Sequence, residues 1–274
     1  MAFLDRDLLR RLSIVALIPP LVWLVLQRGV LGVACVVHLV AALAQAELYA
    51  MTLRDEARAL RAVGVGLGLL AGVVVVWAPA PGLLLPLLIA TTMLLATLQL
   101  FGHRELPRAA TATALLLFGV LYVPLPLATV ALLKRLEHGP LWLVLLLSLT
   151  WLADTGAYLV GRAWGRHKLY PRISPGKSVE GAVGAVAAGL GAVAVAKLWY
   201  LPQLGWGDVL LIAVPGSVLG MLGDLVESML KRSVGVKDSG RLLPGHGGLL
   251  DRIDALLFVA PYVYYYAHFA LGAV

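Results

Sequence analysis

Long apolar segments recur along the whole chain, and they limit its fold more than any other feature of the sequence. A helix needs roughly 20 apolar residues to cross the hydrocarbon core of a bilayer, and the segment 83–101 is one of several that approach this length. Polar and apolar residues do not alternate in these segments, as they would in the strands of an outer-membrane β-barrel. The sequence therefore predicts an all-α polytopic integral membrane protein.

Nine segments are apolar enough to be transmembrane helices. The predicted spans cover 13–27, 30–51, 63–77, 83–101, 111–133, 141–160, 179–200, 208–230 and 255–273. An amphipathic segment, 1–12, precedes them and is expected to lie on the membrane surface as an interfacial helix. We divide the chain into 1–140, with the first five spans, and 141–274, with the last four spans and the loops 161–178 and 231–254.

The basic residues predict how the chain is oriented in the membrane. With a cytoplasmic N-terminus, 18 of the 22 Lys and Arg residues fall in cytoplasmic segments, as the positive-inside rule requires. The odd number of spans then places the C-terminus outside. The net charge of +7 would suggest nucleic acid in a soluble protein, but only 14% of the residues are charged, against about 25% in soluble domains. We therefore expect no nucleic-acid partner, and contact with anionic lipid or phosphate is the second explanation.

Four acids lie inside apolar segments, where an ionisable group is costly and usually functional: Glu47, Asp154, Asp224 and Glu227. Asp154 and Asp224 each lie six residues before the cytoplasmic end of a predicted span, or about 9 Å inside it. Two carboxylates at equal depth could share one Mg²⁺, which commonly binds one or two carboxylates. The alternative is that each acid pairs with a nearby Lys or Arg. Glu47 lies about one turn from the end of its span, and structural and functional roles are equally open for it.

The loop 231–254 holds an unusual set of polar residues. It contains five basic residues, three aspartates, a histidine and five glycines. Glycines let a backbone approach a phosphate closely, and adjacent N–H groups can hold it; Gly247 and Gly248, beside His246, are such a place. The alternative is a basic surface that docks on anionic lipid.

Two aspartates, Asp251 and Asp254, stand at the start of the last predicted span. They are three residues apart and share a helix face. One of them could join the metal site, while the other could cap the helix or pair with Arg252.

The segment 154–181 contains a second basic cluster, whose members are Arg162, Arg166, Lys168, Arg172 and Lys177. Its stretch 174–178, SPGKS, is similar to a phosphate-binding turn but lacks the first glycine of the nucleotide-binding loop. Ser174 and Ser178 could equally cap the next helix, with Glu180 in its first turn. Capping is the favoured interpretation for these two serines.

These residues carry a resemblance to a known family. The segments 228–232 (SMLKR), 237–240 (KDSG) and 243–254 (LPGHGGLLDRID) resemble the signature of phosphatidate cytidylyltransferases, also called CDP-diacylglycerol synthases. The segment 154–181 is similar to the family's other characteristic region. It departs from the family where a lysine, a threonine and a tryptophan are usual, at Gly176, Ser178 and Val179.

The resemblance implies transfer of CMP from CTP to phosphatidate, which gives CDP-diacylglycerol and pyrophosphate, within a catalytic membrane region 141–274. Catalytic candidates are Asp224, Asp251, Lys237 and His246. Substrate contacts are expected from Lys177, Ser178, Ser228, Lys231, Arg232, Gly247, Gly248 and Arg252. The expected Mg²⁺ ligands are Asp224 and Asp251, joined by Asp154, Asp238 and Asp254. A second cation, monovalent or divalent, and a homodimer both stay open.

The expected setting is the bacterial inner membrane, with the active site on the cytoplasmic side and phosphatidate entering laterally from the bilayer. One alternative is a related CTP-dependent cytidylyltransferase that acts on another lipid or isoprenoid phosphate. A membrane transporter is the alternative from a different class, and it predicts polar groups on both sides of the membrane and discontinuous helices near its middle.

Overall fold

Helices make up nearly all of the computed structural model, which describes residues 27–78, 81–102, 106–240 and 247–273. Within these ranges, seven helical segments are long and apolar enough to cross a membrane. The all-α polytopic membrane fold is therefore confirmed. The interfacial helix 1–12 and nearly all of the first predicted span lie outside the described residues. The helix at the ninth predicted span, Leu250–Tyr265, is not among the seven, so the total of nine spans stays a prediction.

The helices begin and end close to the predicted spans. In chain order they are α3 (Val30–Thr52), α4 (Arg58–Trp77), α5 (Leu84–Gly102), α6 (Leu106–Tyr122), α7 (Pro124–Leu133), α8 (Gly139–Trp164), α9 (Val179–Trp199), α10 (Trp206–Ser233) and α11 (Leu250–Tyr265). A short 3-10 helix, Pro81–Leu83, precedes α5, and a π-helical turn, Tyr266–Ala270, continues α11. The largest differences are at the starts of α4, α6 and α11, which each lie five residues before the predicted spans, and at the end of α11, which lies eight residues before the end of the predicted span 255–273.

The predicted span 111–133 is two helices, α6 and α7, that meet at Val123. The backbone of Val123 has φ −108° and ψ −63°, and Pro124 is the first residue of α7. Proline has no N–H to donate, and its ring clashes with the preceding turn of a helix. The break lies within one of the seven candidate spans, Leu106–Arg135, so the predicted span is confirmed and only its interruption was not predicted.

An antiparallel hairpin outside the helices was not predicted. Strand β1 (Lys168–Tyr170) pairs with strand β2 (Ser174–Ser178), with Lys168 opposite Ser178 and Tyr170 opposite Ser174. The expected loop 161–178 therefore consists of the last turn of α8 followed by this hairpin. Three- and five-residue strands leave almost no alternating pattern in a sequence, so this element gave no signal.

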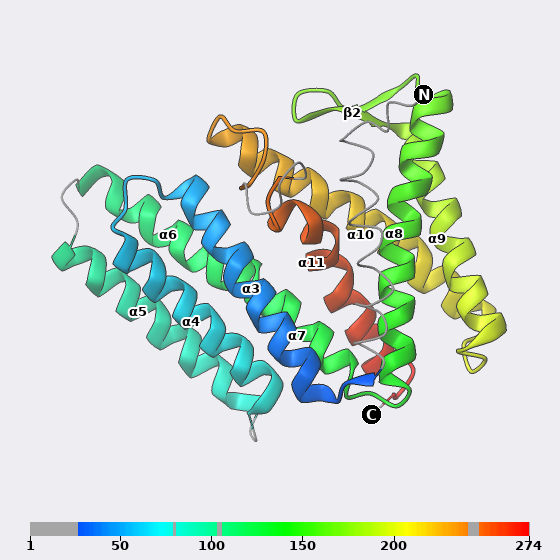
Figure 1. Ribbon diagram of the computed structural model, residues 1–274, viewed down its shortest axis with the longest axis horizontal. Helices are drawn as coiled ribbons and strands as arrows, with labels where there is room; N and C mark the ends of the chain where they lie inside the picture. The colour runs from blue at the N-terminus through cyan, green and yellow to red at the C-terminus, as the bar shows by residue number, and fades with distance from the viewer. Residues whose placement is uncertain (1–26, 79–80, 103–105, 241–246, 274) are drawn as a thin grey trace, which may run out of the picture.

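The helices form two groups, which Figure 1 shows side by side. In the first group, α3 and α4 pack on one another and on α6 and α7; in the second, α9 packs on α8 and α10, and α10 packs on α11. Helix α7 joins the groups, because it contacts α3 and α4 on one side and α11 on the other. The last turns of α3 and α10, the first turn of α11 and the hairpin all lie at the same end of the molecule (Figure 1).

A buried polar network holds the first group together. The side-chain amide of Gln45 donates to the Tyr49 hydroxyl at 2.8 Å and to the Gly64 carbonyl at 3.0 Å, and the Tyr49 hydroxyl donates to the Leu116 carbonyl at 2.5 Å. A Cβ atom at Gly64 would lie 2.8 Å from the Tyr49 ring. Glycine at this position of α4 therefore allows α3 to approach closely.

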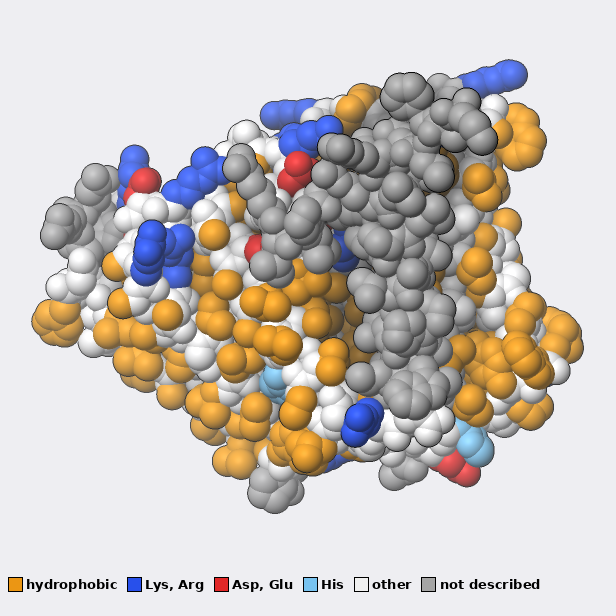
Figure 2. All heavy atoms as spheres, viewed as in Figure 1, with side chains coloured by type: hydrophobic (Ala, Val, Ile, Leu, Met, Phe, Trp, Pro, Cys, Tyr) orange, Lys and Arg blue, Asp and Glu red, His pale blue; other side chains and the backbone are white. Residues whose placement is uncertain are grey.

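The outer surface of the helices is apolar, as a lipid-facing surface must be. Leu85, Phe101 and Leu198 are 67%, 85% and 72% exposed. Figure 2 shows such side chains over the flanks of the molecule, while many Lys and Arg side chains gather at the end that carries the hairpin. This arrangement places the charged residues outside the apolar belt.

Candidate active site

The hairpin is fastened to the start of α9, and this places the second basic cluster. The Glu180 carboxylate accepts the backbone N–H groups of Arg166 and His167 at 3.1 and 3.2 Å and lies 2.6 Å from the His167 ring nitrogen Nδ1. The backbone N–H of Val179 donates to the His167 carbonyl at 2.8 Å. Strand β2 is thereby held against the helix ends, and its Lys177 extends to α10.

Lys177 and Asp224 form an ion pair that joins the hairpin to α10. Their Nζ and Oδ2 atoms are 2.6 Å apart, and the side chains are 22% and 33% exposed. The Ser228 hydroxyl, one turn further along α10, donates to the other oxygen of Asp224 at 3.3 Å. The segment 154–181 therefore meets α10 at Asp224, seven residues before the loop 231–254.

Two more carboxylates surround this pair. Asp154 of α8 and Asp254 of α11 both interact electrostatically with Asp224 and with Lys177. Helices α10 and α11 approach closely here. A Cβ atom at Gly223 would overlap the backbone carbonyl of Asp254, so the approach requires glycine at this position. Three helices thus bring one aspartate each to the same region.

The helices that carry the two intramembrane aspartates continue beyond the predicted spans. Helix α8 runs on to Trp164 and α10 to Ser233. Asp154 therefore lies about 15 Å, and Asp224 about 13 Å, from the ends of their helices at 1.5 Å per residue. The extra turns are polar, so the hydropathy pattern did not include them in the spans.

A buried ion-pair cluster lies one to two turns further along α10. The Lys231 ammonium contacts the carboxylates of Glu227, on its own helix, and of Asp251, at 2.6 Å. The side chains of Lys231, Glu227 and Asp251 are 12%, 1% and 8% exposed. One cation therefore balances two nearly inaccessible carboxylates.

The second oxygen of Asp251 contacts the connection between α10 and α11, called the signature loop here, of which residues 234–240 and 247–249 are described. It accepts the backbone N–H of Ser239 at 3.0 Å, the Ser239 hydroxyl at 3.0 Å and the backbone N–H of Gly248 at 2.7 Å. Gly247 has φ +79°, and a Cβ atom there would lie 2.6 Å from this oxygen. The Gly248 N–H that the sequence suggested for a phosphate is directed at Asp251 instead.

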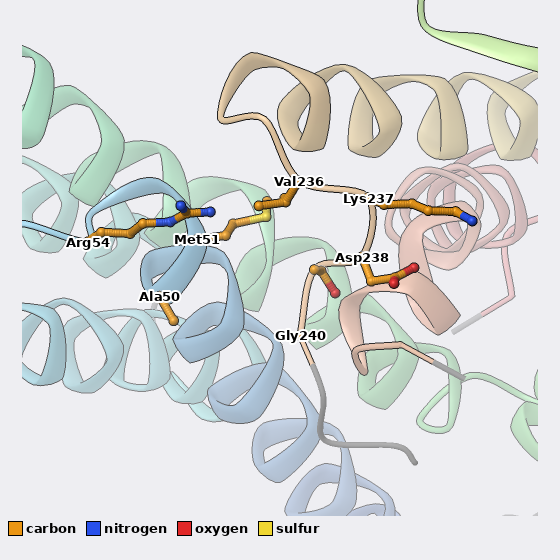
Figure 3. Close-up of a pocket in the computed structure, with 8 residues that line it drawn as sticks. Ala50, Met51, Arg54, Val236, Lys237, Asp238 and Gly240 are labelled. Carbon is orange, nitrogen blue, oxygen red and sulfur yellow. The ribbon is translucent and has the colours of Figure 1, made fainter. Parts of the chain in front are cut away.

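A cavity of about 400 Å³ opens beside this loop, between α3 and the residues that follow α10. Its lining comprises Ala50, Met51, Arg54, Val236, Lys237, Asp238, Ser239 and Gly240. Figure 3 shows Arg54, in the turn that follows α3, reaching toward Val236, while Lys237 points away from Arg54. The first helical group therefore contributes residues to the surroundings of the signature loop, which the sequence did not indicate.

The remaining candidate residues occupy different places. Ser178 is buried, and its hydroxyl accepts the N–H of Gly181 at 3.1 Å, so the capping alternative is confirmed for it. Ser174 lies in β2 instead of at the helix start. Arg232 is exposed and donates to the Val236 carbonyl at 3.1 Å, and Arg252 interacts electrostatically with Asp154. His246 lies outside the described residues, and each of these substrate-binding roles stays a prediction.

The carboxylates fit a divalent cation by their chemistry, because Asp and Glu oxygens are the ligands that Mg²⁺ takes from proteins. Within the described ranges, Asp224 and Asp254 carry one or two hydrogen-bond or ion-pair contacts each, which leaves lone pairs for a metal. Asp251 contacts Lys231 through one oxygen and the loop through the other, so it would bind a metal in exchange for one of these contacts. Among the described residues, no group of three His, Cys, Asp or Glu side chains is arranged as a metal site. An ion shared by Asp224 and Asp251 therefore stays a prediction.

Sequence reasoning gave no role to three residues of this region. Glu227 was noticed only as an acid in an apolar segment, and Ser239 only as part of the signature. Glu47 was left with two open roles, yet its carboxylate accepts the backbone N–H of Leu250 at 2.9 Å, 203 residues away in the chain. Its polarity within an apolar helix was the only available signal.

Comparison with known proteins connects this arrangement to a family. The chain is 52% identical to the phosphatidate cytidylyltransferase of Staphylococcus haemolyticus (strain JCSC1435) over 112 residues. This aligned region covers 40% of this chain and 43% of that protein. The chain is 45% identical over 129 residues to the enzyme of that name from Bacillus subtilis (strain 168), covering 47% and 48% of the two chains. The aligned region thus spans less than half the length of these relatives. The model of the cytidylyltransferase family matches residues 9–270, and the chain therefore belongs to the cytidylyltransferase family.

Proposed function

We propose that this protein transfers CMP from CTP to phosphatidate. An oxygen of the lipid phosphate attacks the α-phosphorus of CTP, the bond from that phosphorus to the bridging oxygen breaks, and pyrophosphate leaves. The products are CDP-diacylglycerol and pyrophosphate. One observation carries this proposal. Two basic segments meet carboxylates at one end of the molecule, Lys177 at Asp224 of α10 and Lys231 at Asp251 of α11. The chain that carries them belongs to this family.

The chemistry asks for positioning and charge neutralisation more than for a strong base. A phosphate monoester is already largely ionised near neutral pH, since its second pKa is about 6. The cost lies in bringing anionic groups together and stabilising the leaving pyrophosphate. Lys177, Lys231, Lys237 and Arg252 are cations that can bind these phosphates. His246 is proposed to hold a phosphate or to protonate the leaving group.

Mg²⁺ is the proposed cofactor. Asp224 and Asp251 would hold it, with Asp154, Asp238 and Asp254 as further ligands. When bound, the ion would neutralise phosphate charge and orient the triphosphate. The protein's own lysines would then be free to exchange a carboxylate partner for a substrate phosphate.

The proposed setting is the inner membrane, with nine spans, a cytoplasmic N-terminus and the site near the inner-leaflet interface. The described loops that follow α3, α8 and α10 lie at one end of the molecule, and those that follow α7 and α9 lie at the other (Figure 1). This alternation supports the charge-based orientation. A site at this end would receive CTP from the cytoplasm and phosphatidate from the bilayer.

The test is synthesis by the purified protein in mixed micelles. We expect radiolabel from cytosine-labelled CTP to enter CDP-diacylglycerol when phosphatidate is present, and chelation of Mg²⁺ to abolish this. An isoprenoid phosphate in place of phosphatidate is the control for the related transferase. Incorporation only with the isoprenoid phosphate would refute the proposed substrate, and solute flux in liposomes without any incorporation would indicate a transporter.

A further inference from the structure

Glu47 of α3 contacts the signature loop at the start of α11, from the other helical group. Its Oε2 atom accepts the backbone N–H of Leu250 at 2.9 Å and the hydroxyl of Ser239 at 3.4 Å. These partners follow it by 203 and 192 residues. Among the described residues, this carboxylate is therefore a direct polar link between the first group and the residues around Asp251.

The loop is shaped around this carboxylate. A Cβ atom at Gly240 would lie 2.5 Å from Glu47 Oε1, and one at Gly248 would lie 2.5 Å from Oε2. Real Cβ atoms do not approach oxygen so closely, so both positions depend on glycine for this packing. The backbone on either side of the segment 241–246 thus closes on the same side chain.

Glu47 and Asp251 share one hydroxyl group. The Ser239 hydroxyl lies 3.4 Å from Glu47 Oε2 and 3.0 Å from Asp251 Oδ2. A serine hydroxyl has a single proton to donate, so it can serve only one carboxylate at a time. Glu47 therefore competes with Asp251 for the proton of the Ser239 hydroxyl and affects how Asp251 is oriented.

A purely structural cap would not need this residue type. Capping the first turn of α11 requires only a neutral acceptor, such as the oxygen of serine or asparagine. Burying a carboxylate instead is costly unless its charge is used or balanced. The second oxygen of Glu47, Oε1, is buried and has no hydrogen-bond partner among the described residues. The charge of Glu47 thus has a cost that capping alone does not explain.

We propose that Glu47 is a positioning residue of the active site, which orients Asp251 through Ser239 and the first turn of α11. The inference rests on the proposed function, because it gives Asp251 its catalytic role. Removing the charge of Glu47 weakens its bond to the Leu250 N–H and leaves the Ser239 hydroxyl to Asp251 alone, so the orientation of Asp251 changes. The chemical step then slows, while binding of the lipid is preserved.

The experiment compares Glu47→Gln with wild type for kcat, for the KM of phosphatidate and for Tm in detergent. Glutamine keeps the size and one acceptor oxygen but removes the charge. We expect kcat to fall about 10- to 100-fold, the range found when a residue that supports an active-site ligand is lost, with the KM of phosphatidate unchanged. Gln45→Leu is the matched control, since Gln45 is buried on the same helix and its hydrogen bonds to described residues lie within the first group. It should lower Tm and leave kcat unchanged.

Coupling to Ser239 separates positioning from general destabilisation. The Ser239→Ala variant should lower kcat, and the Glu47→Gln/Ser239→Ala double variant should lose less than the product of the two single losses. Multiplying losses would overturn the route through Ser239, and a wild-type kcat in Glu47→Gln would overturn the inference itself. If Glu47→Gln does not fold, an unchanged kcat in Ser239→Ala overturns it as well. An inactive wild-type protein would instead count against the proposed function.

Discussion

Replacing Asp224 with asparagine tests the centre of the proposed site. The side chain pairs with Lys177 at 2.6 Å and accepts the Ser228 hydroxyl at 3.3 Å. Asparagine keeps the shape and the hydrogen-bond acceptor but removes the charge. We expect CTP-dependent lipid synthesis to be lost and any residual activity to need more Mg²⁺, while the protein still folds.

The size of each effect follows from the geometry of the pair. Two unit charges 2.6 Å apart attract by about 1.6 kcal/mol in bulk water and by about 6 kcal/mol at an effective dielectric constant of 20. Both side chains are partly exposed, at 33% and 22%, so solvent screening brings the net contribution to stability down to about 1 kcal/mol. Loss of an electrostatic group from an active site costs about 100- to 1000-fold in kcat. Activity should therefore fall far more than stability.

The assay is Mg²⁺ titration of the purified variant, with folding checked by size-exclusion chromatography in detergent. Asp208→Asn is the matched control on the same helix. Asp208 lies at the opposite end of α10, where its carboxylate accepts the Gly205 N–H at 2.6 Å and the Tyr266 hydroxyl at 2.7 Å. Its loss should cost about 1 kcal/mol of capping and leave turnover nearly unchanged. An Asp224→Asn protein with wild-type turnover and an unchanged Mg²⁺ response would refute the reasoning.

Three further outcomes are expected. Lys231→Met removes the cation shared by two buried carboxylates, so the free energy of unfolding should fall by about 3–5 kcal/mol and Tm in detergent should fall with it. The Lys231→Met/Glu227→Gln variant should recover part of this loss, and an unchanged Tm would contradict the buried cluster. Lys237→Gln should lower turnover by about 2–4 kcal/mol at an equal yield of folded protein, and wild-type activity would leave Lys237 with an orientation role only. A reporter enzyme that is active only outside the cytoplasm should be active when fused after Val274 and inactive after Gly240, and the reverse would refute the predicted orientation.

The helices could be predicted because hydropathy reports directly on burial in lipid. The predicted span 30–51 differs from α3 by one residue, and 179–200 differs from α9 by one residue. The hairpin and the break at Val123 could not be predicted in this way, since one is too short for a periodic signal and the other lies inside an unbroken apolar segment. Proline at 124 was the only local clue to the break.

The residues of the site were easier to select than their partners. Asp224 was selected as an acid inside an apolar segment and Asp251 as an acid at the start of the last predicted span, and each is found in an ion pair. The sequence proposed one shared ion, whereas the described contacts pair Asp224 with Lys177 and Asp251 with Lys231. Which lysine reaches which carboxylate depends on how α10 crosses α11 and on the hairpin, and neither leaves a trace in residue spacing.

The contact between Glu47 and Leu250 has a consequence for synthesis of the chain. The ribosome adds about 5–20 residues per second, so the 203 residues between these partners take about 10–40 s to emerge. During that interval α3 is expected to reside in the bilayer with an acidic side chain that has not met its final partner. Retention of this helix by the insertion machinery until α11 arrives would spare Glu47 that exposure, and a chain that terminates before residue 250 would present an unmatched acid to membrane proteases. The contact between Glu47 and the start of α11 therefore forms only after residue 250 has been synthesised.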